Sequence, residues 1–320
     1  MTNPLTAMPD QQIDRLIGAL DSLKDGDLAA EMLIACGQGA VPYLADFLLK
    51  GSPRTISLPR CRAVRALGEL GAYSTLISYF KNYVRPQDST VLFAEDAVRS
   101  AAARELMRCN STEVFHVLLD AAWQRATGGL VLALGEFHRL ESVPLLFEAL
   151  EDDLCREDAM NSLRGLPDAT RQFGILAIRG LTGVTIEGAG ARCRMRATLQ
   201  ILSELGVAKG DWPDLCRFLR ESDPGTVIAA SQIGFTVAPD TELPEIVIAL
   251  FEIAKKLGFV QEDEVQQLLD AHPGIAREIA TQIAKQRRDS GERPNWLSPS
   301  WRILNHALGR SLEGGRPTSA

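Results

Sequence analysis

Residues 62–76 read Arg-Ala-Val-Arg-Ala-Leu-Gly-Glu-Leu-Gly-Ala-Tyr-Ser-Thr-Leu, and this stretch decides the fold. Val64, Leu67 and Leu70 recur every three residues with charged side chains between them, which gives a helix one apolar face. A glycine at the end of such a run is typical of a helix end, so a second helix is expected to return over residues 72–80. The stretch therefore predicts a helical hairpin.

The same pattern occurs twice more, at residues 130–137 (Leu-Val-Leu-Ala-Leu-Gly-Glu-Phe) and residues 196–206 (Arg-Ala-Thr-Leu-Gln-Ile-Leu-Ser-Glu-Leu-Gly). The glutamates within the three stretches recur at two nearly equal intervals, at Glu69, Glu136 and Glu204. Three prolines also recur, at Pro42, Pro144 and Pro213. The interval from Pro42 to Pro144 is longer than the glutamate intervals, and the interval from Pro144 to Pro213 is nearly equal to them. All four intervals are close to two or three times a length of about 34 residues, which predicts repeated helical hairpins.

Further helices are predicted on either side of these repeats. Proline suits the first turn of a helix, where its missing N–H has no intrahelical use, so Pro42 and Pro144 are predicted to open return helices. No run alternates apolar and polar residues over the length of a strand, and the chain is therefore expected to be all-α. The other predicted helices span residues 95–106, 112–122, 243–257, 265–269, 275–288 and 296–308.

The last of these helices has an apolar face formed by Trp301, Leu304 and Leu308. A helix of this kind is expected to seal the end of a repeat array, because terminal repeats need a cap with a polar outer side. The alternative is a tethered recognition helix for the groove of a partner.

Two segments carry a resemblance to a known family, namely Asp96-Ala-Val-Arg99-x-x-Ala102 and Arg62-x-x-Arg65-Ala-Leu-Gly68-x-Leu-Gly71. Together with Val-Pro-x-Leu at the start of the following helix, they resemble HEAT repeats of the short bacterial type also found in phycobilin lyases. The resemblance covers about residues 28–235, although the unit at 151–182 lacks the Leu-Gly signature and a glycine-rich insert at 183–191 breaks the spacing.

The resemblance implies an α-solenoid, in which stacked hairpins form a superhelix. It also implies that Asp96 and Arg99 belong to a ladder that links neighbouring units. The predicted division is a repeat solenoid over residues 1–235, C-terminal helical repeats and a cap over 236–310, and a disordered tail over 311–320.

Composition excludes several classes of protein. Of the 320 residues, 46% are hydrophobic and 23% charged, as in globular proteins. The longest apolar stretch, residues 130–135, is far shorter than the roughly 20 residues that span a bilayer, so no membrane insertion is expected. Residues 1–10 lack the features of a secretory signal. The six cysteines occur singly, which indicates reduced thiols and a bacterial-type cytoplasmic protein.

Charge is distributed unevenly along the chain. The net charge is −7, which argues against a protein that coats nucleic acid. Residues 109–170 hold 11 acidic and 4 basic side chains, whereas residues 54–108 hold 5 acidic and 9 basic ones. This alternation indicates either mixed solvated faces or a surface banded for a charged partner.

Sequence patterns for catalysis and for cofactor or metal binding were not found. The four histidines lie far apart without a partner at helical spacing, and GxSxG and GxxxxGK[ST] do not occur. The acidic run of Glu151, Asp152, Asp153, Glu157 and Asp158 lacks EF-hand spacing. It is interpreted as a solvated turn between helices, with a cation site as the alternative. No catalytic residue, cofactor or metal ion is therefore predicted.

The candidate partner-binding residues are two arginine clusters and a row of glutamates. Arginines at a helix start oppose the helix dipole, and such a locally unfavourable choice is sometimes the mark of a binding site. The alternatives are salt bridges between neighbouring units for the arginines and simple solvent exposure for the glutamates. The candidates are Arg60, Arg62, Arg65, Arg192, Arg194, Arg196, Glu69, Glu136 and Glu204.

The predicted function is that of a non-catalytic scaffold or adaptor that presents a curved repeat surface to a partner protein. One alternative is an immunity or regulatory protein that inhibits one partner enzyme. A second is an alkylpurine DNA glycosylase of HEAT-like architecture, which would need a basic groove and an aromatic cage that the sequence does not indicate. A phycobilin lyase is the third, and only the repeat similarity points to it.

Overall fold

The computed structural model describes residues 10–180, 188–295 and 297–309, and every regular element in these ranges is helical. The chain divides into two compact units, Met1–Leu166 (unit 1) and Pro167–Ala320 (unit 2). The predicted division after residue 235 stays a prediction. Most of the glycine-rich insert, Trp296 and the predicted tail lie outside the described residues.

Unit 1 is built from helices that follow one another in pairs. Its α-helices are α1 (Asp10–Ala19), α2 (Gly26–Ala35), α3 (Val41–Leu49), α4 (Leu58–Glu69), α5 (Tyr73–Lys81), α6 (Ser89–Leu106), α7 (Thr112–Gln124), α8 (Gly128–Glu136), α9 (Val143–Ala149) and α10 (Arg156–Arg164), with 3-10 helices at Gly37–Ala40 and Leu140–Ser142.

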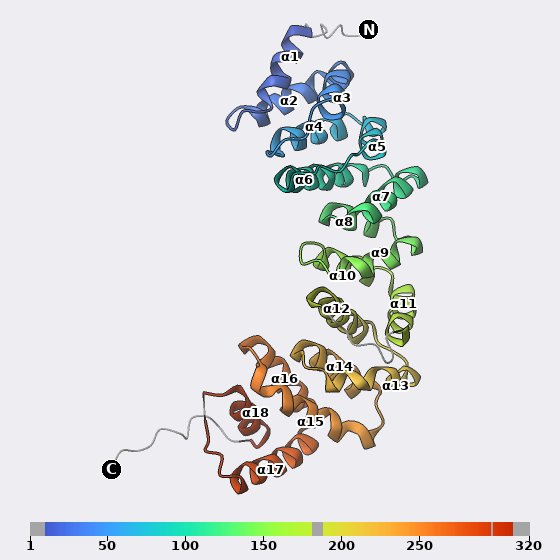
Figure 1. Ribbon diagram of the computed structural model, residues 1–320. Coiled ribbons are helices and arrows are strands. Elements are labelled where there is room, and N and C mark those ends of the chain that lie inside the picture. The colour runs from blue at the N-terminus through green and yellow to red at the C-terminus, as the bar shows by residue number, and fades with distance from the viewer. Residues whose placement is uncertain (1–9, 181–187, 296, 310–320) are drawn as a thin grey trace, which may run out of the picture. The chain divides into compact units, whose positions relative to one another are not determined.

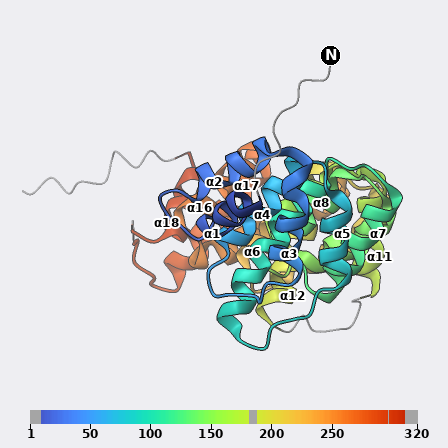
Figure 2. The same ribbon diagram turned by 90° about the horizontal axis from the view of Figure 1, so that it is seen from above.

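The first helices of successive pairs pack on one another in unit 1. Helix α4 lies between α2 and α6, and α8 lies between α6 and α10. Figures 1 and 2 both show α4, α6 and α8 in one layer, with α5 and α7 in a second layer beside it. The core between the layers is aliphatic and includes Leu67, Leu106, Leu118 and Leu134, all of which are fully buried.

Helix ends in unit 1 follow the predicted chemistry. Pro42 and Pro144 lie in the first turns of α3 and α9, as predicted. Gly71 adopts a φ of +68°, which favours glycine, and the Ala72 N–H donates to the Leu67 carbonyl oxygen at 2.9 Å. Residues 62–69 of the predicted helix are confirmed as part of α4, which also includes Leu58–Cys61 and ends at Glu69.

Helix α6 begins earlier than predicted. The sequence pattern placed its start at Glu95, but the structure places it at Ser89. The Asp88 side chain accepts hydrogen bonds from the backbone N–H groups of Thr90 and Val91, so a capped start extends the helix by more than a turn.

Unit 2 continues with helices from α11 onward. Its α-helices are α11 (Pro167–Gly180), α12 (Ala189–Leu205), α13 (Trp212–Leu215), α14 (Pro224–Val237), α15 (Leu243–Ile253), α16 (Phe259–Ala271), α17 (Pro273–Asp289) and α18 (Pro299–Ala307), with 3-10 helices at Lys209–Asp211, Cys216–Arg220, Asp240–Glu242 and Ala254–Lys256.

The predicted C-terminal helix is present as α18, and it closes the apolar core of unit 2. Leu304 is fully buried in that core, and Trp301 packs against it. Arg302 donates to both carboxylate oxygens of the buried Glu262 on α16, at 2.7 and 2.5 Å. This docking is what a cap requires.

Candidate functional site

Arg62, predicted to bind a partner, lies in the interior of unit 1. Its guanidinium donates to Asp27 Oδ1 and to the carbonyl oxygens of Leu20 and Ser22, each at 2.8 Å. A Cβ on Gly26 would overlap this guanidinium, so a glycine is required there. The contacts are of the kind expected from salt bridges between neighbouring helix pairs.

Arg60 is also buried and takes part in a charged network with α5 and α6. Its two terminal nitrogens donate to the Gly51 carbonyl oxygen at 2.9 Å and to Glu95 at 3.0 Å. The Tyr79 hydroxyl donates to the same carboxylate oxygen of Glu95. Burial, and then the charge of Glu95, raises the pKa of Tyr79 well above its usual 10.0. The partner-binding role of Arg60 and Arg62 stays a prediction, and the site described below does not depend on it.

The remaining predicted arginines are at least partly exposed: Arg65, Arg192, Arg194 and Arg196. Arg65 pairs with Glu31 of the preceding helix pair. The other three lie on α12 in unit 2, where Arg196 approaches Asp223 at 3.7 Å. Their role in partner binding likewise stays a prediction.

The predicted glutamate row is exposed at all three positions. Glu69 ends α4 and accepts a hydrogen bond from Arg108 at 2.9 Å. Glu136 ends α8 in the same unit, whereas Glu204 belongs to α12 in unit 2. The structure therefore brings only Glu69 and Glu136 into one unit, on helices two repeats apart.

The link that the family resemblance implies for Asp96 and Arg99 takes a different form in the structure. The two side chains approach at 3.6 Å within α6. Asp96 is also bonded to Arg125 at the end of α7, whose Nε donates to it at 2.7 Å. Arg99 is fully buried, donates to the Ala121 carbonyl oxygen and lies 4.5 Å from the centre of the Tyr83 ring.

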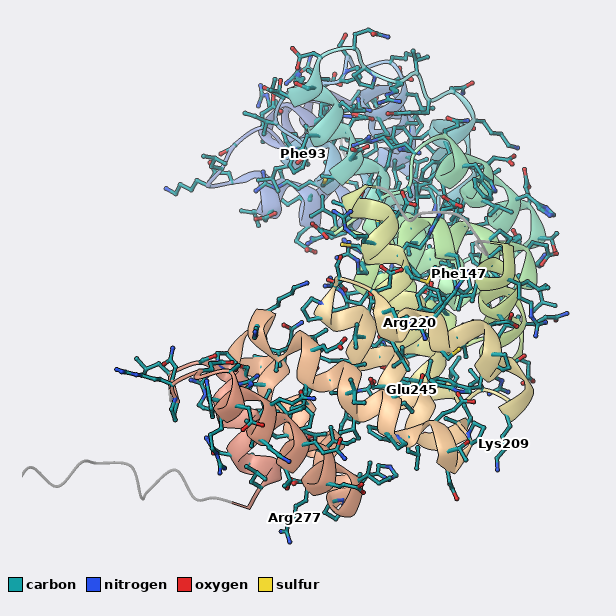
Figure 3. All side chains as sticks on the ribbon, turned by 60° about the horizontal axis from the view of Figure 1, so that its bottom comes forward. Phe93, Phe147, Lys209, Arg220, Glu245 and Arg277 are labelled. Carbon is teal, nitrogen blue, oxygen red and sulfur yellow. The ribbon has the colours of Figure 1, made fainter. Side chains whose placement is uncertain are left out.

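Large apolar side chains are exposed at the starts of the first-layer helices of unit 1. Leu23 and Ile56, in the turns before α2 and α4, are 84% and 63% exposed. Phe93, near the start of α6 and labelled in Figure 3, is 69% exposed. Leu154, in the turn before α10, is 75% exposed. We call these four side chains the apolar edge. Isolated exposed apolar residues are ordinary, but a series of them near the starts of several helices in one layer is not.

Polar contacts show that neighbouring parts of the apolar edge adjoin. Asp21, in the turn before α2, pairs with Arg54, in the turn before α4, at 2.8 Å. Arg60 joins the turn at Gly51 to α6. Along the sequence, Leu23, Ile56 and Phe93 follow one another at 33 and 37 residues, close to one repeat length, and Leu154 follows Phe93 after 61 residues.

Phe93 and Leu154 line one cavity, which we call the α6–α10 hollow. Its volume is about 270 Å³, and it is lined by the first half of α6, by residues 125–129 and by residues 152–158. The hollow thus draws its walls from three successive helix pairs. Its volume is slightly below the range of about 300–1,000 Å³ that is usual for small-molecule sites.

Carboxylates dominate the charge around this hollow. Asp96 is paired with Arg125, whereas Asp152 and Asp158 face the hollow from the turn before α10 and from its first turn. Burial, supported by the nearby Asp152 and Asp158 charges, raises the pKa of the Cys155 thiol from 9.0 to about 12. Three acidic and two basic residues line the hollow, so carboxylates are in excess by one and favour a cationic ligand.

The α6–α10 hollow also contains a buried hydroxyl without a partner. Thr127 is 7% exposed, and its Oγ1 makes no hydrogen bond. Thr127 precedes α8, but its side chain does not cap that helix. An unpaired buried hydroxyl costs about 1–3 kcal/mol, so a structural role does not account for it.

A metal ion is not supported as the ligand of the acidic run. Within residues 10–180, 188–295 and 297–309, no group of three or more His, Cys, Asp or Glu side chains is arranged to hold one. Asp153 pairs with Arg156, and Asp152 accepts a hydrogen bond from the Leu154 N–H at 2.8 Å. Residues 151–153 lie in a solvated turn between α9 and α10, as the sequence indicated, whereas Glu157 and Asp158 lie in the first turn of α10. Asp152 and Asp158 also line the hollow.

The apolar edge was not predicted from the sequence. A signal was present, because Leu23, Ile56 and Leu154 each stand shortly before a first-layer helix. Exposure was not predictable from these residues alone, since apolar residues near a helix start are as often buried.

No family model matches this chain, and comparison with curated proteins finds no match either. Among the described helices, none is long and apolar enough to cross a membrane.

The raised pKa of Cys155 predicts a pH dependence of stability. Above pH 9.0 the thiol ionises in the unfolded chain but stays protonated in the folded chain until about pH 12, so unfolding releases a proton. Stability is therefore lost as the pH rises through this window. We expect the free energy of unfolding of the wild type to fall relative to Cys155→Ala between about pH 9 and pH 11 in urea titrations. Parallel curves would contradict the assignment.

Proposed function

We propose that the chain is a HEAT-like α-solenoid, acts as a non-catalytic interaction module and binds a partner protein along the apolar edge of unit 1. The observation that carries this proposal is the presence of exposed large apolar side chains at or near the starts of four first-layer helices, α2, α4, α6 and α10. Such rows suit repeat proteins, whose equivalent positions form one extended binding surface. A contiguous exposed apolar surface is typical of an interface.

Polar contacts at the repeat length support the solenoid arrangement within each unit. Arg62 bonds to Asp27, 35 residues away, and Lys81 bonds to Glu113, 32 residues away. In unit 2, Arg179 donates to Asp214, which is 35 residues distant. Repeated bonds between equivalent positions are expected when hairpins of one length stack side by side.

The cytoplasm is the proposed location. All six cysteines are free thiols in the structure, and they are spread over both units. This usage suits a reducing compartment, where thiols do not pair.

The test is a comparison of partner capture by matched surface variants. The edge variant carries Leu23→Ser, Ile56→Ser and Phe93→Ser. The control carries Trp123→Ser, within α7, and Leu140→Ser, in the 3-10 helix before α9. Both substitutions remove exposed apolar side chains of the same unit, away from the apolar edge. Each tagged protein is used to capture partners from its native cells, and these are quantified by mass spectrometry.

We expect the edge variant to lose at least one partner by about tenfold or more, because each buried apolar side chain contributes about 1.5–3 kcal/mol. The control is expected to retain that partner, and the circular dichroism of both variants should match the wild type. Equal capture by the two variants would refute the assignment of the edge. The purified partner would then show whether binding is tight and exclusive, as an inhibitory or immunity protein requires, or shared among several targets.

A further inference from the structure

We infer that the α6–α10 hollow receives an arginine side chain of the partner protein. This inference rests on the proposed function, since Phe93 and Leu154 of the apolar edge both line the hollow. A partner segment that contacts these two side chains therefore lies beside the hollow.

The size of the hollow favours one side chain over a free small molecule. Its volume of about 270 Å³ is at the lower limit of ligand pockets, and its lining includes the apolar side chains of Phe93 and Leu154. A long side chain can enter such a space while its neighbours in the partner chain contact Phe93 and Leu154. The aliphatic part of an arginine side chain can contact Phe93 and Leu154, while its charged guanidinium reaches the carboxylates of Asp152 and Asp158.

The charge of the hollow selects a cation. Asp152 and Asp158 line it without a cationic partner among the described residues, whereas Arg125 is neutralised by Asp96 at 2.7 Å. Arg104 also lines the hollow, and it is exposed to solvent, as Asp152 is. Three acidic residues (Asp96, Asp152 and Asp158) and two basic ones (Arg104 and Arg125) line the hollow, so its net charge is −1.

The shape of the polar groups favours a guanidinium over an ammonium group. Thr127 Oγ1 is buried without a partner and can accept one N–H, while the two carboxylates can accept others. A guanidinium presents five N–H donors in one plane, and that plane can also stack on the exposed ring of Phe93. A lysine offers a compact ammonium that cannot stack in this way.

The experiment uses the full chain with labelled methyl groups of Thr127 and Leu154, observed by methyl NMR. The probes are acetyl-Leu-X-Leu-amide peptides in which X is arginine, lysine, citrulline or glutamate. Citrulline keeps the shape of arginine without its charge. We expect saturable shifts with arginine, about fivefold weaker binding with lysine, at least tenfold weaker binding with citrulline and none with glutamate.

Three variants and one control locate the contacts. Asp152→Asn and Asp158→Asn should each weaken the arginine peptide about five- to tenfold, while leaving the citrulline peptide unchanged. Glu157→Gln removes the same charge from α10 outside the hollow and should have an effect of less than twofold. Thr127→Val removes only the unpaired hydroxyl, so it should weaken the arginine peptide about fivefold although the melting temperature does not fall.

Equal binding of the arginine and citrulline peptides would overturn the inference, and so would a Glu157→Gln effect as large as that of Asp158→Asn. The captured partner separates this inference from the proposed function. If the edge variant loses the partner but Asp152→Asn with Asp158→Asn retains it fully, the hollow is not the arginine site and the edge still stands. If neither protein loses the partner, the proposed function itself fails.

Discussion

Glu95→Ala is expected to lower the free energy of unfolding of unit 1 by about 3–5 kcal/mol, the largest effect of any single carboxylate in that unit. Glu95 is 2% exposed and accepts hydrogen bonds from Arg60 and Tyr79. Its removal leaves the buried Arg60 charge without its carboxylate partner. The Arg60 bond to the Gly51 carbonyl oxygen does not replace that charge.

Urea unfolding of Glu95→Ala, Glu95→Gln and Glu113→Ala, each compared with the wild type, measures this effect. Glu95→Gln keeps an acceptor for Tyr79 but removes the charge, so its loss should fall between those of wild type and Glu95→Ala. Glu113→Ala breaks the exposed bond to Lys81 and should cost no more than about 1 kcal/mol. A Glu95→Ala loss as small as that of Glu113→Ala would show that the Arg60 network does not stabilise the unit.

Gly129→Ala is expected to destabilise unit 1 by about 3 kcal/mol, because α8 packs backbone to backbone on α6 at this position. A Cβ on Gly129 would lie 2.5 Å from the Cα and 2.7 Å from the carbonyl carbon of Ser100. Backbone atoms cannot turn aside as a flexible side chain can, so the two helices must separate.

The matched control is Gly18→Ala in α1, where an added Cβ meets no atom within 4 Å. Alanine is the better helix former by about 1 kcal/mol, so this variant should be neutral or more stable than wild type. Thermal and urea unfolding of both variants give the comparison. Similar behaviour of the two alanine variants would exclude the proposed close contact between α6 and α8.

Much of the helical pattern could be predicted from local chemistry. Pro42 and Pro144 indicated helix starts, and Gly71 indicated a helix end, because these residues act through their own backbone. The start of α6 was missed because the Asp88 cap adds a segment, Ser89–Ala94, to which the periodic apolar pattern does not extend. Local signals of that kind are weaker than an apolar period.

The candidate site was less predictable, because it depends on which helices meet. Arg60 and Arg62 have the composition of a surface patch, yet carbonyl oxygens and carboxylates of other helices enclose them. Thr127 and Asp158 are far apart in the sequence, and only the packing of α8 on α10 places both at one hollow. A single sequence gives no direct signal for such a meeting point.

The bonds from Arg62 to Asp27 and from Lys81 to Glu113 each reach only as far as the adjacent hairpin. In the proposed solenoid, each interior hairpin of unit 1 would offer its neighbours nearly the same two faces. Duplication of one hairpin during evolution would then leave the existing junctions intact and would lengthen the row of exposed apolar side chains by one. Under the proposed function, the length of the binding surface would therefore change in steps of one hairpin, without a redesign of the interior.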